Sequence, residues 1–313
     1  MGGAGGVQAG DMRTPLQLPR EIVDGTWYTN DELDRLGVTR AQRRQLVAPH
    51  RGVYGRRLPR TLLEDIEAVS RVVPDDAVVC GESALWLHRL PHLQQWSPSP
   101  RPPIHLLVPG QRRIRSSTVR DHRSHGRRVA AMPVEGLALR VLSPPALFAQ
   151  MAPHLSFLDT VILGDAVVRW RSMWTLDHLE AALVPGLPGV VQARRALTHV
   201  RPGSNSVAET KSRLLLLEAG LPEPELNASI VVDGTWLAFV DFLWRRHRLV
   251  VEYYGIHHFT SDQQRRDDLH RVRALRDHDF RVEELTNRDL ADPAGMVARV
   301  ARALREQERV LGL

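Results

Sequence analysis

The sequence predicts a multidomain α/β protein, on three observations. The chain has 313 residues, enough for two or three domains that each bury a core. Helical and strand patterns alternate after residue 206. The charge is also uneven, because residues 1–130 hold 20 basic and 13 acidic residues, whereas residues 207–313 hold 16 and 18. A basic module joined to a near-neutral one suggests that the basic part binds an anionic polymer.

Composition excludes several classes of protein. Residues 1–20 begin with small, flexible residues and have no apolar core, which predicts a disordered tail and no signal peptide. The single cysteine, Cys80, allows neither a disulfide framework nor a cysteine-based zinc site within one chain. No stretch reaches the ~18 uninterrupted apolar residues that a membrane helix needs. We therefore expect a cytoplasmic protein without a membrane partner.

Residues 21–62 are predicted to form a winged helix-turn-helix. Thr29 precedes Glu32 by three residues, and Thr39 precedes Gln42 by three, so two short helices each begin with a capping-box pattern. Gly37 supplies the turn between these helices. The following "HRGVYGRR" is punctuated by glycine and is typical of a strand or wing.

This segment is rich in arginine and contains no acid between Leu36 and Leu63. Arginines on a second helix and a wing can contact DNA, although they are also common on a solvated helix face. The candidate nucleic-acid contacts are Arg40, Arg43, Arg44, Arg51, Arg56 and Arg57.

The rest of the chain divides by composition into three parts. Residues 63–200 mix helical and strand patterns, which predicts an α+β middle domain without a clear catalytic constellation. Residues 201–206, "RPGSNS", have the composition of a linker. Residues 207–313 follow the order helix, three strands, helix, strand, helix, which predicts one compact α/β sandwich.

Two acids face each other in that sandwich. In "LAFVDFLWRRHRLVVEYYGIHHF", residues 237–259, a turn centred on Arg246 and His247 places Asp241 opposite Glu252. Facing like charges destabilise a sheet unless something neutralises them, and the apolar neighbours predict that both faces are largely buried. A bound Mg²⁺ or Mn²⁺ would neutralise the pair, as would an arginine or histidine. The remaining alternative is two surface carboxylates on an edge hairpin.

The order "SVAE", "VDF", "VEYYGIHHF" and "DLHRVRAL" resembles the very-short-patch-repair-like branch of the PD-(D/E)XK nuclease superfamily. The resemblance implies a restriction-endonuclease-like α/β/α sandwich. The N-terminal segment, "GESALWLHRLP" and "LSPPALF" are similar to actinobacterial proteins that pair an AbiEi-type antitoxin DNA-binding domain with such a nuclease-like domain. Together these resemblances cover nearly the whole chain.

Carried over by position, the resemblance implies that Asp241, Glu252 and Glu209 hold the metal and that His258 lies near the phosphate or the attacking water. The metal would polarise the scissile phosphate and lower the pKa of that water. Each assignment has an alternative, because Glu209 also lies three residues after Ser206 and suits a capping box. His258 likewise suits a buried core position.

The following helix carries Asp268 and Arg271, and the resemblance makes Arg271 a candidate nucleic-acid contact. Their spacing of three residues also suits a surface ion pair. The second position after Glu252 departs from the family pattern, since Tyr254 stands where Asp or Lys is usual. A tyrosine with a pKa near ~10 is a poor base at neutral pH. Lys211 does not replace it, because it points to a different side of the helix from Glu209.

Two functions follow from the sequence. The first is a DNA-binding protein whose C-terminal domain is a metal-dependent endonuclease. The second is an antitoxin-like transcriptional regulator in which the nuclease fold survives as a scaffold. Tyr254 favours the regulator, and the facing acids favour the enzyme. DNA is the expected partner in both cases, and a cognate toxin or a second copy of the chain is left open.

Overall fold

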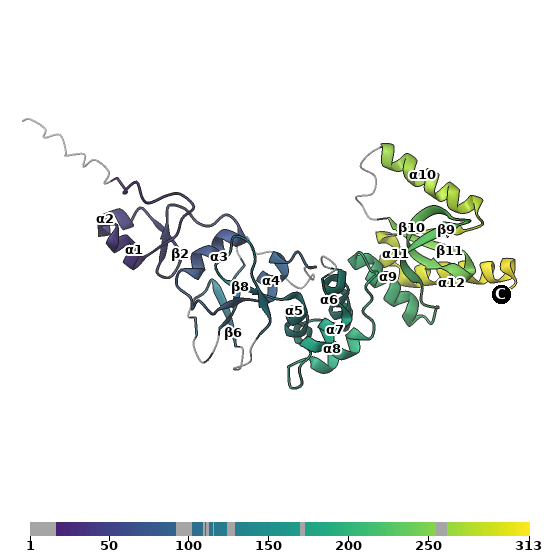
Figure 1. Cartoon of the computed structure of the whole chain (residues 1–313), viewed down its shortest axis with the longest axis horizontal. Coiled ribbons are helices and arrows are strands. Elements are labelled where there is room, and N and C mark those ends of the chain that lie inside the picture. Colours follow the sequence, from purple (N-terminus) through teal and green to yellow (C-terminus); the bar gives the residue numbers. More distant parts are fainter. Residues whose placement is uncertain are drawn as a thin grey trace, which may run out of the picture. The chain divides into compact units, whose positions relative to one another are not determined.

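The computed structural model describes residues 17–91, 102–108, 110, 113–114, 116–123, 129–169, 173–254 and 262–313, with the backbone alone described for 262–269. The described residues form a mixed α/β protein with sheets of three, five and four strands (Figure 1). The chain divides into two compact units, drawn from residues 1–84 with 98–142 and from residues 85–97 with 143–313. No helix in the described part is long and apolar enough to cross a membrane.

The N-terminal segment contains both predicted capping boxes. The Thr29 side chain accepts the Glu32 N–H while the Glu32 carboxylate accepts the Thr29 N–H, and Thr39 and Gln42 do the same. Gly37 turns the chain between the two helices with a φ of 68°. The elements are β1 (Tyr28–Thr29), α1 (Asn30–Arg35), α2 (Arg40–Arg43), β2 (Val47–His50), β3 (Val53–Gly55) and α3 (Leu62–Ser70). The strand order is β1-β3-β2, all antiparallel.

A second sheet completes the first unit. Its order is β6-β5-β4-β8-β7, and every residue of β5 is buried. The elements are β4 (Val78–Val79), α4 (Gly81–Leu87), β5 (Ile104–Val108), β6 (Val119–Arg123), β7 (Ala131–Met132) and β8 (Arg140–Leu142). Buried His50 joins this region to the first sheet, because its Nε2 lies 2.9 Å from Asp65 Oδ1 and its Nδ1 lies 2.8 Å from Thr118 Oγ1.

From residue 143 to the predicted linker, the described part of the second unit contains four α-helices. They are α5 (Pro144–Met151), which continues into the 3₁₀ turn η1 (Ala152–His154), α6 (Phe157–Arg169), α7 (Leu176–Ala182) and α8 (Val190–Leu197). The predicted middle domain, 63–200, therefore contributes to both compact units. The predicted boundaries at 62 and 200 stay predictions, and the sequence pattern does not anticipate α8.

The predicted order after residue 206 is confirmed, with one short extra helix, α11. The elements are α9 (Val207–Glu218), β9 (Glu225–Val232), β10 (Thr235–Trp244), the 3₁₀ turn η3 (Arg245–His247), β11 (Leu249–Tyr254), α10 (Asp262–Asp277), β12 (Arg281–Thr286), α11 (Asn287–Ala291) and α12 (Pro293–Leu311). The sheet order is β12-β11-β10-β9, and only β11 and β12 are parallel.

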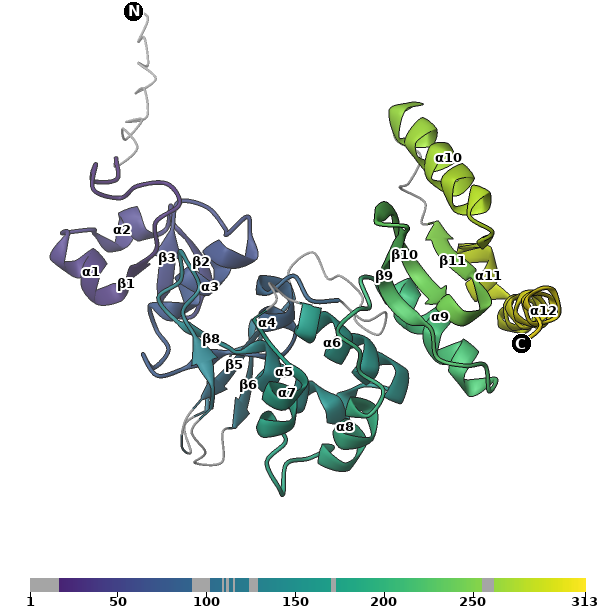
Figure 2. The same cartoon turned by 45° about the vertical axis from the view of Figure 1, so that its right-hand side comes forward.

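Helices cover both faces of this last sheet (Figures 1 and 2). On one face, Leu216 of α9 and Val300 of α12 pack with Phe242 and Val251 of the strands. On the other side, Leu275 of α10 packs in a cluster that includes Val250. Three layers result, with the sheet in the middle.

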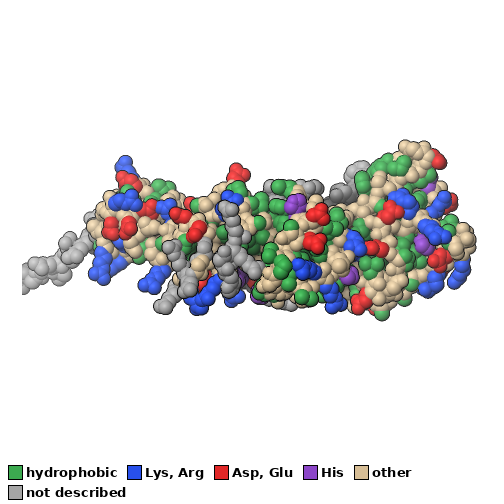
Figure 3. Space-filling view, turned by 60° about the horizontal axis from the view of Figure 1, so that its bottom comes forward, with side chains coloured by type: hydrophobic (Ala, Val, Ile, Leu, Met, Phe, Trp, Pro, Cys, Tyr) green, Lys and Arg blue, Asp and Glu red, His purple; other side chains and the backbone are tan. Residues whose placement is uncertain are grey.

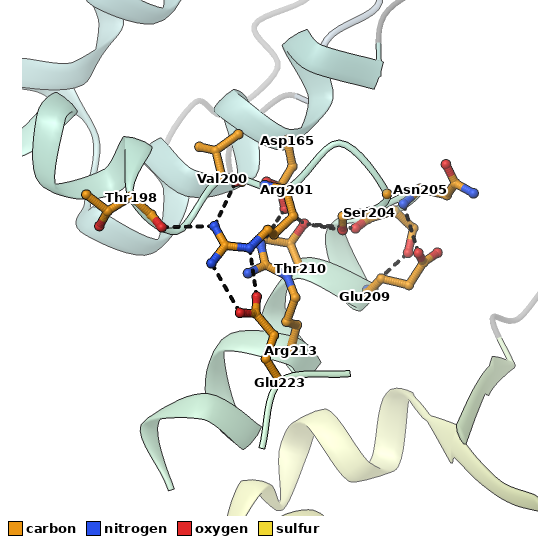
Figure 4. A network of polar contacts seen from close by, with 12 residues as sticks. Asp165, Thr198, Val200, Arg201, Ser204, Asn205, Glu209, Thr210, Arg213 and Glu223 are labelled. Carbon is orange, nitrogen blue, oxygen red and sulfur yellow. Dashed lines mark hydrogen bonds and ion pairs between the residues drawn. The ribbon is translucent and has the colours of Figure 1, made fainter. Parts of the chain in front are cut away.

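The predicted linker is held firmly by its neighbours (Figure 4). Asp165 of α6 accepts the N–H of Arg201 at 2.8 Å, and it also accepts bonds from Thr210 and from Arg213 Nη2 on α9, each at 2.8 Å. The side chains of Arg213 and Asp165 are 0% and 2% exposed. Burial raises the pKa of Asp165, while the charge of Arg213 lowers it. Residues 201–206 therefore connect α8 to α9 and are held against α6 by these hydrogen bonds.

The buried pair predicts a large effect on stability. Arg213→Met should lower the free energy of unfolding by about 3–5 kcal/mol, because it leaves Asp165 without its counter-charge in the core. Arg201→Gln is the matched control, since the Arg201 side chain pairs with exposed Glu223 and its backbone N–H to Asp165 remains. The control should change stability by about 1 kcal/mol or less. Urea unfolding measures both, and equal losses would contradict this account.

Candidate active site

Asp241 and Glu252 stand at matching positions of two strands, as the sequence predicts. The ladder between β10 and β11 ends where Phe242 pairs with Val251, and the next residues are Asp241 and Glu252. There the Asp241 Oδ2 accepts the backbone N–H of Tyr253 at 2.7 Å. The side-chain carboxylate thus accepts the hydrogen bond that a backbone carbonyl of a paired strand would accept, and this bond holds Asp241 beside β11.

Glu252 is the most buried acid of this sheet, and an arginine lies next to it. Its side chain is 8% exposed, and its Oε2 is 3.7 Å from Nη2 of Arg271 on α10. The parallel pairing of β11 and β12 also places Glu284 beside Glu252. Sequence reasoning missed Glu284, because the register of a parallel strand is set across a long connection. The acids therefore occupy neighbouring positions on three strands.

Glu209 is buried in the first turn of α9 and interacts with Asp241. Burial raises the pKa of Glu209, and the negative charge of Asp241 raises it further. Two hydrogen bonds lower the pKa of Glu209 in part, because its Oε2 accepts the Asn205 backbone N–H at 2.8 Å and an N–H of the Asn227 side-chain amide at 3.0 Å. Ser206 caps the helix through the Glu209 N–H at 3.1 Å. The Glu209 carboxylate is thus bonded to Asn205 and directed toward the sheet, beyond a simple capping role.

Asn227 is an unusual residue for the middle of a strand. Its φ is +45°, in the left-handed region that residues other than glycine rarely adopt. Its Nδ2 donates to the Gly203 carbonyl at 2.5 Å as well as to Glu209, and its Oδ1 accepts from Asn205. Such strain persists where the surroundings impose it, commonly at functional sites. No signal in the sequence distinguishes this asparagine from others.

Tyr254 lies beside the acids and stays neutral at ordinary pH. Burial raises the pKa of its phenol, and the charge of Glu252 raises it further, while a hydrogen bond with Arg271 lowers it in part. A phenol in this state cannot act as a general base near pH 7. It can position Arg271 through the hydrogen bond.

Two predicted site residues lie beyond what the structure describes. His258 falls in residues 255–261, outside the described residues, and Asp268 falls in the part of α10 whose side chains are not described. Their roles stay predictions. The expectation that the hairpin is buried on both faces holds for Phe242, Leu243 and Trp244 but is wrong for Phe239, which is 59% exposed.

The structure brings two of the three predicted metal ligands, Asp241 and Glu252, to matching positions of adjacent strands. Across the described parts of the chain, no group of three His, Cys, Asp or Glu side chains could hold a metal ion, so the three predicted ligands do not form a closed cage. Mg²⁺ is usually bound through one or two carboxylates, with water and substrate phosphate completing its shell. Two carboxylates, such as those of Asp241 and Glu252, are the number of protein ligands that this mode needs. Glu209 already accepts two hydrogen bonds on one oxygen.

The N-terminal arginines fall into two groups. Arg43 is bound to Asp34 and to the Val38 carbonyl, and Arg57 pairs with Glu64 at 2.6 Å and lowers the pKa of that carboxyl to about 2. These two side chains hold the local fold together. The others are exposed, and Figure 3 shows blue basic side chains projecting from this end of the molecule. The exposed members are Arg40, Arg44, Arg51 and Arg56.

Comparison with known proteins assigns no activity to this site. No family model matches the chain. The uncharacterized proteins MT2308 and Rv2248, from two strains of Mycobacterium tuberculosis (CDC 1551 / Oshkosh and ATCC 25618 / H37Rv), are each 28% identical to it over 213 residues. Each match covers 67% of this chain and 76% of the relative.

The strained asparagine leads to a stability prediction. Asn227→Gly relieves the backbone strain but removes a hydrogen bond to the buried carboxylate of Glu209, so we expect a net loss of about 1–2 kcal/mol. Asp233→Gly is the matched control, because Asp233 lies in the turn between β9 and β10, has a φ of +50° and is exposed. It should be nearly neutral by urea unfolding. A stabilised Asn227→Gly protein would show that the amide does not hold Glu209.

Proposed function

We propose that this protein binds duplex DNA through its N-terminal segment and that its C-terminal domain is a metal-dependent DNA endonuclease. The observation that carries the proposal is the placement of Asp241 and Glu252 at matching positions of adjacent strands, with Glu209 interacting electrostatically with Asp241. The three-layer order around β12-β11-β10-β9 supports the resemblance to the very-short-patch-repair-like nucleases.

The proposed DNA contact rests on the exposed arginines. Arg40 and Arg44 lie on or directly after α2, and Arg51 and Arg56 flank β3. This distribution suits a winged helix-turn-helix in which α2 enters the groove and the loop before β3 tracks the backbone. Arginine charges that are not already paired within the fold contribute most to phosphate binding, because they release counterions from DNA.

In the proposed reaction, Asp241 and Glu252 would hold Mg²⁺ or Mn²⁺, with Glu209 close by. When bound, such a cation supplies charge to the scissile phosphate and lowers the pKa of a bound water. Asp241 is oriented for this role by the Tyr253 N–H, and Glu209 by Asn205 and Asn227. Tyr254 would position Arg271, and His258 is proposed to lie near the phosphate or the water.

A second candidate is an antitoxin-like transcriptional regulator whose nuclease fold is a scaffold. The specific observation in its favour is that Arg271 already lies against Glu252, while Tyr254 stands where the resemblance expects an acid or a lysine. Its partners would be DNA and a cognate toxin or a second copy of the chain. For both candidates we propose a cytoplasmic location.

The DNA-binding half of the proposal predicts a salt-dependent interaction. In the full chain, Arg40→Ala with Arg44→Ala should weaken duplex binding and reduce the slope of log K against log salt by about 2. Fluorescence anisotropy across a salt series measures this slope. The control removes two exposed arginines of α12, Arg302 and Arg305, which changes the net charge equally. Binding that is insensitive to salt, or equal loss in the control, would contradict the proposed interface.

The nuclease half predicts that Mg²⁺ or Mn²⁺ raises the melting temperature of the wild-type chain and supports nicking of supercoiled plasmid. A ligand that binds only the folded state stabilises it by mass action. Asp241→Asn should abolish the shift and reduce nicking by at least about 10–100-fold. Without metal it should be as stable as wild type, because an Asn Oδ1 can still accept the Tyr253 N–H while one of the repelling charges is gone.

Opposite results would select the second candidate. If metal leaves the wild-type melting temperature unchanged while Asp241→Asn destabilises the metal-free protein, the acids are structural. The Tyr254→Asp variant then distinguishes a nuclease site that has degenerated from acids that are purely structural. It introduces the acid that the family carries, so a degenerate site should gain a metal response, whereas a purely structural site should only lose stability.

A further inference from the structure

Arg271 is directed at the acids by the way its helix packs. Leu275 follows it by one helical turn, so the two side chains lie on the same side of α10. Leu275 is fully buried in the cluster that contains Val250, and Val250 precedes Glu252 by two residues on the same face of β11. Packing of the apolar pair therefore places the guanidinium at the carboxylate, where the distance is 3.7 Å.

The two members of this pair differ in their freedom to move. Glu252 sits on a central strand with a side chain that is 8% exposed, whereas Arg271 is 29% exposed on a helix. The carboxylate is thus fixed by the sheet, and the long arginine side chain can reach solvent. A buried carboxylate beside other acids needs a counter-charge in every state of the protein.

We propose that Arg271 is the resident counter-cation of Glu252 and that a divalent cation and the Arg271 guanidinium exclude one another at this carboxylate. This inference rests on the proposed function, since it describes how the same site is regulated. Two positive groups cannot both be close to one carboxylate in a poorly solvated site without strong mutual repulsion. Cation binding would therefore release Arg271, which becomes available to a backbone phosphate of bound DNA.

The arrangement gives a simple form of control. Without a cation, the ion pair stabilises the fold and neutralises the charge of Glu252. With a cation bound, the site holds the positive charge that the proposed reaction needs, and Arg271 is available to contact a DNA phosphate. Cation binding and the release of Arg271 from Glu252 are coupled reciprocally. Any group that binds the released Arg271, including a DNA phosphate, therefore raises the affinity of the site for the cation.

The first test is a double-mutant cycle on the full chain in EDTA, with Arg271→Gln, Glu252→Gln and the combined variant. If the pair is resident, each single change lowers the melting temperature, and the double variant loses clearly less than the sum of the two. Additive losses would overturn the proposal, because they would mean that the two side chains do not interact in the metal-free protein. This readout does not depend on activity or on metal.

The second test is Mn²⁺ affinity measured by titration calorimetry. Arg271→Gln should bind Mn²⁺ at least about tenfold more tightly than wild type, a change within the usual range of coupling between sites. Arg273→Gln is the matched control, because Arg273 is an exposed arginine on the same helix and its loss changes the net charge equally. Its affinity should stay within about twofold of wild type.

The outcomes separate this inference from the proposed function. If wild type binds Mn²⁺ and Arg271→Gln binds it equally or more weakly, the exclusion is overturned while the cation site remains. If neither protein binds Mn²⁺, both the cation site and the exclusion are overturned. If Arg271→Gln binds and wild type does not, the exclusion is supported in its strongest form.

Discussion

The buried ion pair between Asp165 and Arg213 is the constraint on which the second unit depends. It removes two charges from water, so its geometry must be precise, and the surrounding bonds to Thr210 and the Arg201 backbone supply that precision. Helix α9 is thereby fixed against α6. Because Glu209 lies one turn before Arg213 on the same helix, the pair also sets the position of an acid whose proposed function lies at the adjacent sheet.

Asp241 and Glu252 of that sheet, and Glu209 on the helix beside it, are compensated in different ways. Asp241 accepts a strand N–H, Glu209 accepts a backbone and an amide N–H, and Glu252 lies against Arg271. Each compensation comes from a different element, so no single change removes all of them. Stability alone would favour apolar residues at these positions, since a well-packed apolar core is often at least as stable as buried charge. The presence of acids here is in keeping with the proposed function, which uses their charge.

The arginines of the N-terminal segment show why charge counts need the tertiary structure. The acid-free run made all of them candidates for DNA contact or for a solvated face, and Arg43 and Arg57 pair with acids outside that run. Arg40, Arg44, Arg51 and Arg56 are exposed and carry the proposed interface. The difference depends on where Asp34 and Glu64 lie in space, because ion pairs between elements do not follow sequence spacing.

The sequence by itself determined the local features. Capping at Thr29 and Thr39, the turn at Arg245–His247 and the order of elements after residue 206 depend on neighbouring residues and on periodicity, which a sequence displays directly. The register of the hairpin followed from that turn, and with it the facing of Asp241 and Glu252. Only the tertiary structure decided which other residues lie beside Asp241 and Glu252. The αL amide of Asn227, the place of Glu284 beside Glu252 and the approach of Arg271 all arise from contacts between elements distant in sequence, whose packing geometry no local pattern encodes.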